Sequence, residues 1–326
     1  MCSEFDIIRR YFMRPTTSAV LGIGDDAALI ASTENTELAI STDTLVSEKH
    51  FFANADPRKL GYKSLAVNLS DMAAMGARPR WVMLALTLPK GLIQGNKEWL
   101  RAFSSGFLEL AHDYQIELVG GDTTCGPLNV CVQIIGEVTK GMALRRSGAK
   151  VGDDIWVSGY LGTAALALAH EQQYFCLEPS EIAECLPALH MPKVRLELGQ
   201  RLIGLAHSAI DISDGLMADL GHILASSNVA AIIKMDKVPC TTIMKKYLHQ
   251  SLAINCLLAG GDDYELCFTA PMIKREKLES LSNELFVPLT RIGSITRGVG
   301  LIVQDTQGSA IELEEPGYDH FRSGYS

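Results

Sequence analysis

Apolar residues recur along the chain with two different spacings, which predict a mixture of strands and helices. In the first 140 residues, strand-like patterns cover 18–31, 36–46, 80–89, 116–124 and 128–138. The pattern at 116–124 is interrupted by Gly120 and Gly121. Helical spacing covers about 56–75 and 96–114, where Pro57 suits a first helical turn and Gly76 a helix end.

Strands and helices alternate in the second part of the chain, which favours an α/β organisation. Strand patterns occupy 154–160, 208–212, 230–235, 264–270 and 289–296; helices are expected from Gly162, Pro192 and Asp214 and near 272–285. The segment 141–153, GMALRRSGAKVGD, is polar, basic and rich in glycine, unlike its surroundings. We therefore predict two domains, 1–140 and 141–326.

Composition narrows the class of protein. A chain of 326 residues with 47% apolar content is long enough for two cores. Its net charge of −9 argues against nucleic-acid and anionic-membrane partners. The eight cysteines form no C-x-x-C pair and the sequence has no H-x-x-x-H, which indicates reduced cysteines rather than zinc. No signal-peptide core or membrane-spanning run is present, so we predict a cytoplasmic protein.

Carboxylates recur where apolar strands and glycine turns end. They are Asp25 and Asp26 in GIGDDAAL, Asp43 in STDT, Asp122 in GGDTT, Asp211 and Asp214 in AIDISDGL, and Asp262 and Asp263 in GGDDYEL; Asp71 lies near a helix end. Two such charges ~4 Å apart repel by about 4 kcal/mol at an effective dielectric of 20. Divalent cations would relieve that repulsion, and oxygen ligands without Cys or His favour Mg²⁺ or Mn²⁺, which in turn hold phosphates.

Each motif also has a simpler interpretation. An aspartate after glycine is commonly a turn residue, and Ser213 and Asp214 could merely cap and charge a helix. The basic segment at Arg146 is either a solvated linker or a phosphate-binding site, and His50 and Tyr318 could be packing residues. The sequence has no P-loop, H-R-D or D-F-G motif. A kinase built on this chain would therefore be of neither common kind.

Taken in order, the motifs resemble the thiamine-monophosphate kinase family. They are GIGDDAAL, STDTLVSEKHF, KSLAVNLSDMAAMGARP, GGDTT, RSGAKVGDDIWVSG, AIDISDGLMADLGHI, GGDDYELCFT and GYDHF, and they span about residues 3–322. The resemblance implies a two-domain α/β protein of α+β type, in which an N-terminal mixed sheet binds ATP and Mg²⁺ and pairs in a homodimer. A C-terminal α/β domain would complete the substrate site. The implied reaction converts ATP and thiamine monophosphate to ADP and thiamine diphosphate.

The resemblance also implies roles for individual residues. Magnesium ligands would be Asp26, Ser41, Thr42, Asp43, Asp71, Asp122, Asp211 and Asp214, of which Asp43, Asp71 and Asp122 would stabilise charge through the metal. Nucleotide-binding residues would be Gly121, Asp122, Arg146, Ser213 and Tyr114. Substrate-binding residues would be His50, Asp262 and Tyr318. The chain departs from the family at Asp262, where relatives often carry glutamate.

Two other interpretations remain open at this stage. The wider superfamily includes selenophosphate synthetase and aminoimidazole ribonucleotide synthetase, which share the glycine–aspartate motifs. The second is a nucleotide-binding regulator without catalytic activity. The presence of all the acids that match metal-binding positions of the family argues against it. The acceptor oxygen of the implied reaction is already anionic, so little general-base catalysis is needed. Catalysis should then consist of positioning and charge neutralisation by several Mg²⁺ ions, and we expect no catalytic nucleophile.

Overall fold

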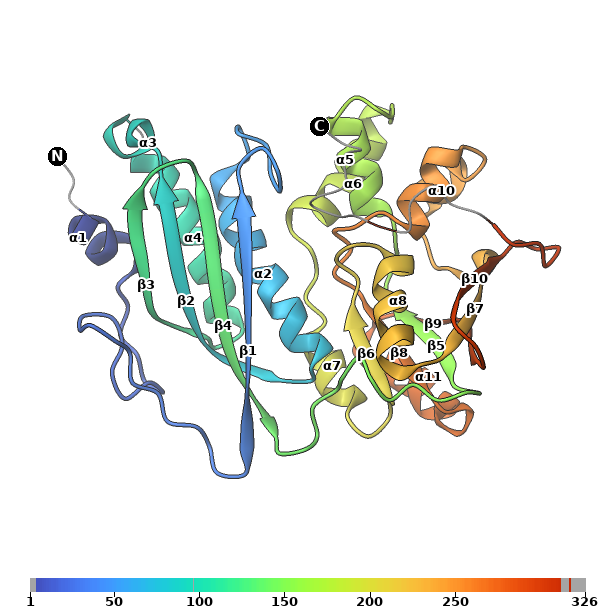
Figure 1. Cartoon of the computed structure of the whole chain (residues 1–326). Coiled ribbons are helices and arrows are strands. Elements are labelled where there is room, and N and C mark those ends of the chain that lie inside the picture. The colour runs from blue at the N-terminus through green and yellow to red at the C-terminus, as the bar shows by residue number, and fades with distance from the viewer. Residues whose placement is uncertain (1–3, 96, 312–316, 318–326) are drawn as a thin grey trace. The chain divides into compact units, whose positions relative to one another are not determined.

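The protein consists of two compact units, each with its own sheet (Figure 1). The computed structural model describes residues 4–95, 97–311 and 317. Unit 1 comprises residues 1–72 and 77–142, and unit 2 comprises 73–76 and 143–326. The two sheets and their helices confirm the predicted mixed α/β fold class.

Unit 1 contains a four-stranded mixed sheet in the order β1-β4-β2-β3. β4 runs antiparallel to both β1 and β2, whereas β2 and β3 are parallel. The strands are β1 (Thr36–Val46), β2 (Arg78–Leu88), β3 (Glu117–Cys125) and β4 (Asn129–Thr139).

Helices α2 (Pro57–Ala74) and α4 (Lys97–Asp113) cover one face of this sheet, which we call the inner face (Figure 1). Apolar side chains of β2 that alternate along the strand are buried there, among them Leu84 and Leu86. Two glycines let the helices approach closely. A Cβ on Gly61 would lie 2.1 Å from the Phe103 carbonyl oxygen, and one on Gly106 would lie 1.9 Å from that of Arg58. Shorter helices in this unit are α1 (Glu4–Ile7), the π-helical turn η1 (Ile8–Phe12) and α3 (Lys90–Gly95).

The opposite, outer face of the sheet is partly covered by residues 17–33, which we call the arm. Ala19, Ala28 and Ile30 of the arm pack against Trp81, Val119 and Ile135 of the sheet. Glu117 accepts hydrogen bonds from the backbone N–H groups of Thr17, Ser18 and Ala19. Glu137 accepts one from the backbone N–H of Thr33 at 2.6 Å. Two carboxylates thus hold the two ends of the arm.

Unit 2 contains a six-stranded sheet in the order β10-β7-β9-β5-β8-β6. Every neighbouring pair is antiparallel except β10 and β7. The strands are β5 (Asp154–Ser158), β6 (Ser208–Asp211), β7 (Ala230–Lys234), β8 (Leu266–Ala270), β9 (Leu289–Thr296) and β10 (Gly300–Gln304).

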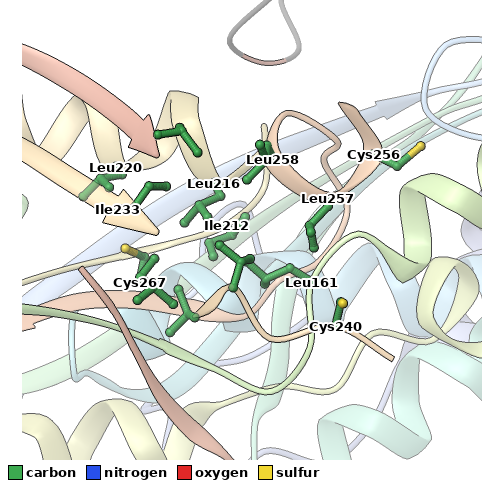
Figure 2. Close-up of a cluster of buried hydrophobic side chains, with 14 of the residues drawn as sticks. Leu161, Ile212, Leu216, Leu220, Ile233, Cys240, Cys256, Leu257, Leu258 and Cys267 are labelled. Atoms are coloured by element: carbon green, nitrogen blue, oxygen red, sulfur yellow. The ribbon is translucent and has the colours of Figure 1, made fainter. Parts of the chain in front are cut away.

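One large apolar core joins the sheet of unit 2 to its helices. Figure 2 shows part of it, where Ile212, Leu216 and Leu220 gather with Cys267 and Leu257. The cysteines in this core act as small apolar residues, and burial raises the pKa of the Cys256 thiol to about 12. The helices are α5 (Thr163–Glu171), α6 (Pro179–His190), α7 (Leu196–Leu202), α8 (Leu216–Ser227), α9 (Thr242–Tyr247), α10 (Ser251–Leu258) and α11 (Arg275–Leu285), with the 3₁₀ turns η2 (Met235–Lys237) and η3 (Met272–Lys274).

Several sequence-based expectations were wrong in detail. Residues 18–31 form no regular strand, because the arm lies on the sheet through side chains and makes only isolated bridges, such as Leu21 with Leu29. Gly120 and Gly121 do not break β3, which instead shifts its register against β2 between Val82 and Met83. A helix was expected from Pro192, but the helix in this region, α7, begins only at Leu196. Sequence analysis did not assign α6, α9, α10 or β10. None of the described helices is long and apolar enough to cross a membrane.

Candidate active site

Ser41, Asp43 and Asp71 come together on the inner face of unit 1. Ser41 and Asp43 are two residues apart on β1, so their side chains point to the same face. The Ser41 hydroxyl donates a hydrogen bond to the Asp71 carboxylate, which comes from the last turns of α2. Asp43 lies within β1, three residues before its last residue Val46, rather than at the strand end that we expected.

The charge in this cluster is poorly compensated. Burial, and to a smaller extent the nearby Asp71 carboxylate, raise the pKa of Asp43 to about 7. All donors here are oxygens, and a divalent cation would offset the repulsion between the two acids. The residues therefore fit a magnesium ion, which Ser41, Asp43 and Asp71 would hold.

Asp122 lies apart from this cluster. The cross-strand row that starts at Asp43 continues through Val132 and Leu84 to Gly121, about 14 Å away across three strand spacings. Asp122 is the next residue, so its side chain points to the outer face, where it is exposed. A Cβ on Gly121 would lie 1.9 Å from the Leu84 carbonyl oxygen, so the strand requires glycine there. Asp122 also lies inside β3, not after it.

Two other predicted metal ligands also lie away from the inner-face cluster. Thr42 alternates with Ser41 and therefore faces outward, where its hydroxyl oxygen lies 3.4 Å from Gln133 Nε2. Asp26 is an exposed residue of the arm, beside the turn at Gly24. Within unit 1 the predicted ligands therefore divide between the two faces of the sheet.

His50 follows β1 in a tight turn. Its Nδ1 accepts a hydrogen bond from the backbone N–H of Val46 at 3.0 Å. This contact places the proton of the neutral ring on Nε2, which makes that edge a donor. His50 is thus held in one tautomer suited to an anionic or carbonyl acceptor.

Tyr114 does not lie beside Gly121 and Asp122, with which the sequence grouped it. It follows the end of α4 and lies near Tyr62 of α2, whose pKa is raised by burial and then by Tyr114 and Asp113. Tyr114 comes just before β3, which starts at Glu117. Asp122 lies five residues further along that strand, a separation of about 17 Å from Glu117. Unit 1 alone does not bring these nucleotide-binding candidates together.

In unit 2, Asp211 ends β6, and Ser213 and Asp214 lie in the loop that leads from β6 to α8. Asp211 thus lies at the strand end where we expected it, and its side chain is buried. The helix begins at Leu216 with Gly215 as its N-cap, so neither Ser213 nor Asp214 caps it. Asp219 instead turns back from the first turn. Its Oδ2 accepts the backbone N–H groups of Ser213, Asp214 and Gly215 at 3.0, 3.0 and 3.1 Å.

Asp219 therefore fills the cradle of amides that such a helix start would otherwise offer to a phosphate. Sequence analysis missed this residue, although a signal was available. Asp219 follows Leu216 by three residues and precedes Leu220, which places a carboxylate on the apolar face of the helix. A buried acid on such a face needs partners, and the three amides supply them.

The loop 259–265 lies beside the start of α8. The backbone N–H of Asp262 donates to the Ser213 carbonyl at 2.9 Å, and that of Tyr264 donates to the Ile212 carbonyl at 2.8 Å. Asp262 and Tyr264 both have positive φ, 69° and 50°, which is rare for residues other than glycine. The Tyr264 hydroxyl donates to Asp262 Oδ1 at 3.0 Å. The Asp262 carboxylate is thus oriented by its own loop.

A buried ion pair anchors the end of this loop. Arg195 donates from Nε and a terminal nitrogen to the two oxygens of Glu265, at 2.6 and 2.5 Å. The Ser158 hydroxyl donates to the same carboxylate at 2.5 Å. Sequence analysis proposed no role for Arg195 or Glu265. Breaking such a buried pair commonly costs about 3–5 kcal/mol, so it is a strong structural constraint on the loop.

Arg146 belongs to a turn of unit 2, residues 145–149, of which 145–148 are exposed and Ala149 is buried. The Arg146 side chain is open to solvent. Tyr318 lies outside the described residues. Gly317, which precedes it, packs on the start of α8: a Cβ on Gly317 would lie 2.4 Å from Ala218 Cβ and 2.9 Å from the Asp214 carbonyl oxygen. Among residues 4–95 and 97–311, no three His, Cys, Asp or Glu side chains converge in a metal-binding arrangement.

Comparison with known families defines the class of protein. Residues 24–138 match AIR synthase related protein, N-terminal domain, and residues 150–306 match AIR synthase related protein, C-terminal domain. Together with the two sheets, these matches define a two-domain AIR synthase related protein. The hydrogenase maturation protein HypE of E. coli, 21% identical with a TM-score of 0.76, shares this fold.

Closer relatives narrow the class. Thiamine-monophosphate kinase of Escherichia coli (strain K12) is 45% identical over 324 residues, covering 98% of each chain. The enzyme of Bacillus subtilis (strain 168) is 33% identical over 328 residues, covering 98% of this chain and 99% of the relative. The chain belongs to the thiamine-monophosphate kinase family.

Solved structures agree with this assignment. Thiamine-monophosphate kinase from Stenotrophomonas maltophilia K279a has a TM-score of 0.83 and 46% identity, covering 94% of this chain and 95% of that chain. AaThiL complexed with AMPPCP and TMP has a TM-score of 0.75 and 28% identity, covering 89% of each chain. The family resemblance drawn from the motifs is thus confirmed.

Proposed function

We propose that this protein transfers the γ-phosphoryl group of ATP to thiamine monophosphate, giving ADP and thiamine diphosphate. The observation that carries the proposal is the 45% identity over 98% of both chains to a thiamine-monophosphate kinase. The neighbour AaThiL was solved with AMPPCP and TMP, a pair that matches the two substrates proposed here. The oxygen-only cluster of unit 1 agrees with chemistry on phosphates.

The proposal assigns metal binding to eight residues. Ser41, Asp43 and Asp71 form the inner-face cluster of unit 1. In unit 2, Asp211 ends β6 and Asp214 lies in the β6–α8 loop. Asp26, Thr42 and Asp122 rest on the family motifs alone, because the structure places them apart from the cluster. Several magnesium ions at these residues would neutralise charge on the transferring phosphoryl group.

The nucleotide- and substrate-binding roles are likewise assigned from the family motifs. We assign Gly121, Asp122, Arg146, Ser213 and Tyr114 to ATP, and His50, Asp262 and Tyr318 to thiamine monophosphate. The Tyr264 hydroxyl holds the Asp262 carboxylate in place. This contact favours a fixed acceptor for a cationic ligand, even though the side chain is one methylene shorter than the glutamate of relatives.

We propose a direct, in-line transfer. A bond forms between a phosphate oxygen of thiamine monophosphate and the γ-phosphorus, and the bond from that phosphorus to the β–γ bridging oxygen of ATP breaks. The electron pair leaves with ADP. The acceptor oxygen is already anionic, so no residue of this chain needs to remove a proton from it. The residues instead bind, orient and stabilise charge.

Three further expectations belong to the proposal. The protein acts as a homodimer through its N-terminal sheets, it works in the cytoplasm, and residues of domains 1–140 and 141–326 both take part in the reaction. The outer face of the unit 1 sheet is a reasonable dimer surface, because Leu38 and Ile40 on β1 are 43% and 60% exposed. Sedimentation of the purified protein would test the homodimer.

The decisive experiment is product analysis with purified protein, ATP and Mg²⁺. The acceptor panel contains thiamine monophosphate, thiamine, selenide and formylglycinamidine ribonucleotide. We expect ADP release to depend on thiamine monophosphate, with thiamine diphosphate formed in equal amount. Turnover with selenide or the ribonucleotide alone would instead assign the protein to the other superfamily activities. Nucleotide binding without turnover on any acceptor would favour a regulator.

A further inference from the structure

The turn that carries Arg146 is held by one hydroxyl group from another element of unit 2. Ser227 is the last residue of α8 and lies far from this turn in sequence. Its Oγ accepts the backbone N–H groups of Gly148 and Ala149, both at 3.1 Å. The same Oγ donates to the Arg146 carbonyl oxygen at 3.2 Å.

These three contacts use the whole hydrogen-bonding capacity of a serine hydroxyl, one donor and two acceptor positions. The two accepted hydrogen bonds hold Gly148 and Ala149 at the end of the turn, and the donated one holds the backbone carbonyl of Arg146. Ser227 is partly buried, and of its three partners only Ala149 packs in the apolar core, so Arg146 and Gly148 depend on the hydroxyl for their place in the turn.

The start of the turn is fixed separately. The Arg145 carbonyl accepts the backbone N–H of Ala209 in β6 at 2.9 Å. Gly148 has a φ of 117°, and a Cβ there would lie 2.5 Å from the His207 carbonyl oxygen. The backbone of 145–149 is therefore tied to β6 and α8, while the side chains of Arg145 and Arg146 extend into solvent.

A fixed backbone under an exposed arginine is what recognition of a phosphate requires. Ordering an exposed loop on binding costs free energy that weakens affinity, and a loop already held in place avoids that cost. Arginine gains most from this, because its planar group makes paired hydrogen bonds only in the correct orientation.

We propose that Ser227 is a positioning residue for ATP, which sets nucleotide affinity by holding Arg146 without touching the nucleotide. The proposal rests on the function proposed above, in which Arg146 contacts ATP. Because Ser227 would act on binding in the ground state and the transition state alike, its loss should raise KM for ATP and leave kcat nearly unchanged.

The test compares three variants of the full-length protein. Ser227→Ala removes the hydroxyl, Ser227→Thr keeps it, and Ser226→Ala is the matched control at the neighbouring exposed position of the same helix. We expect Ser227→Ala to raise KM for ATP about three- to tenfold, the range of one or two lost hydrogen bonds. Ser227→Thr and Ser226→Ala should stay within twofold of the parent protein, and KM for thiamine monophosphate should not change.

Two readouts separate this proposal from the proposed function. Hydrogen exchange at the Gly148 and Ala149 amides should accelerate in Ser227→Ala only. Calorimetry with AMPPCP and Mg²⁺ should show the same loss of affinity as KM, whichever acceptor the enzyme uses. If the parent protein binds AMPPCP but ignores thiamine monophosphate, the proposed function falls and the Ser227 proposal is still decided. Faster exchange with unchanged AMPPCP affinity, or equal effects of Ser226→Ala and Ser227→Ala, would overturn the Ser227 proposal.

Discussion

Replacing Glu117 with glutamine should release the end of the arm from the sheet of unit 1. Glu117 Oε1 accepts the Thr17 and Ser18 backbone N–H groups at 2.6 and 2.8 Å, and Oε2 accepts that of Ala19 at 3.1 Å. The hydroxyls of Thr17 and Ser18 donate to the same carboxylate. A glutamine would set its own NH₂ group against one set of these donors, so at least two hydrogen bonds would be lost.

The pKa of Glu117 indicates the size of the effect. Partial burial raises the pKa, but the hydrogen bonds from Thr17, Ser18 and Ala19 outweigh burial and lower it from 4.5 to about 2. At 1.36 kcal/mol per unit, this shift corresponds to about 3 kcal/mol as an upper limit. The group is partly open to solvent, and screening reduces the expected contribution to about 1–2 kcal/mol.

The pH dependence follows from the direction of the shift. Because the pKa of Glu117 is lower in the folded protein, its stabilisation is fully present above the unfolded pKa of 4.5 and is lost as the pH falls towards 2. Glutamine does not titrate. The difference between the parent protein and Glu117→Gln should therefore be largest near pH 7 and should shrink by roughly a quarter at pH 4.

Urea unfolding followed by tryptophan fluorescence would measure this difference, because Trp81 donates to Ser18 Oγ at 3.0 Å and reports on the arm. Glu34→Gln is the control, since Glu34 is an exposed acid just beyond the arm. It should change the free energy of unfolding by less than about 0.5 kcal/mol. A Glu117→Gln effect that equals the control, or that grows as the pH falls, would refute the reasoning.

Three other predictions concern the reaction. Asp71→Asn should fold normally and lose on the order of 10²–10³ in turnover, because it weakens charge stabilisation at the inner-face cluster; parent-like turnover at saturating Mg²⁺ would contradict this. Direct transfer predicts inversion at a chiral γ-phosphorus, and net retention would require two successive displacements. Tyr318→Leu should weaken thiamine monophosphate by roughly two- to thirtyfold through loss of an aromatic face for the thiazolium cation, whereas Tyr318→Phe should do little. Calorimetry with both substrates checks this last prediction, and equal losses for ATP would assign Tyr318 to packing.

Most regular elements of the fold were predictable from local pattern. The alternation at 36–46 predicts β1 with its observed ends, and the pattern at 56–75 predicts α2 to within a residue or two, because Pro57 and Gly76 mark the ends of that helix in the sequence. The same reasoning wrongly assigned a strand to the arm. Its apolar residues Ala19, Ala28 and Ile30 cover Trp81 without forming a ladder, and local pattern cannot separate a covering segment from a strand.

The helices α6, α9 and α10 were missed for a related reason. α9 has only six residues and is capped by Thr241, and α6 carries Pro187 inside it. Short helices like these are stabilised by tertiary packing more than by their own sequence. Figure 2 shows α10 residues Cys256, Leu257 and Leu258 within the core of unit 2, a placement that only the folded chain provides.

The sequence by itself determined the family, the acid-rich motifs and the fold class, because motif order and apolar period are local properties that survive without coordinates. Tertiary structure decided which acids meet. Ser41 faces Asp71 while Thr42 and Asp122 face the other side of the sheet, since alternate residues of a strand point in opposite directions. It also decided that Asp219, Glu265, Arg195 and Ser227 hold the loops that carry the predicted site residues. Those contacts join segments far apart in the chain, and they exist only because buried or closely approached polar groups must find partners once the apolar core has formed.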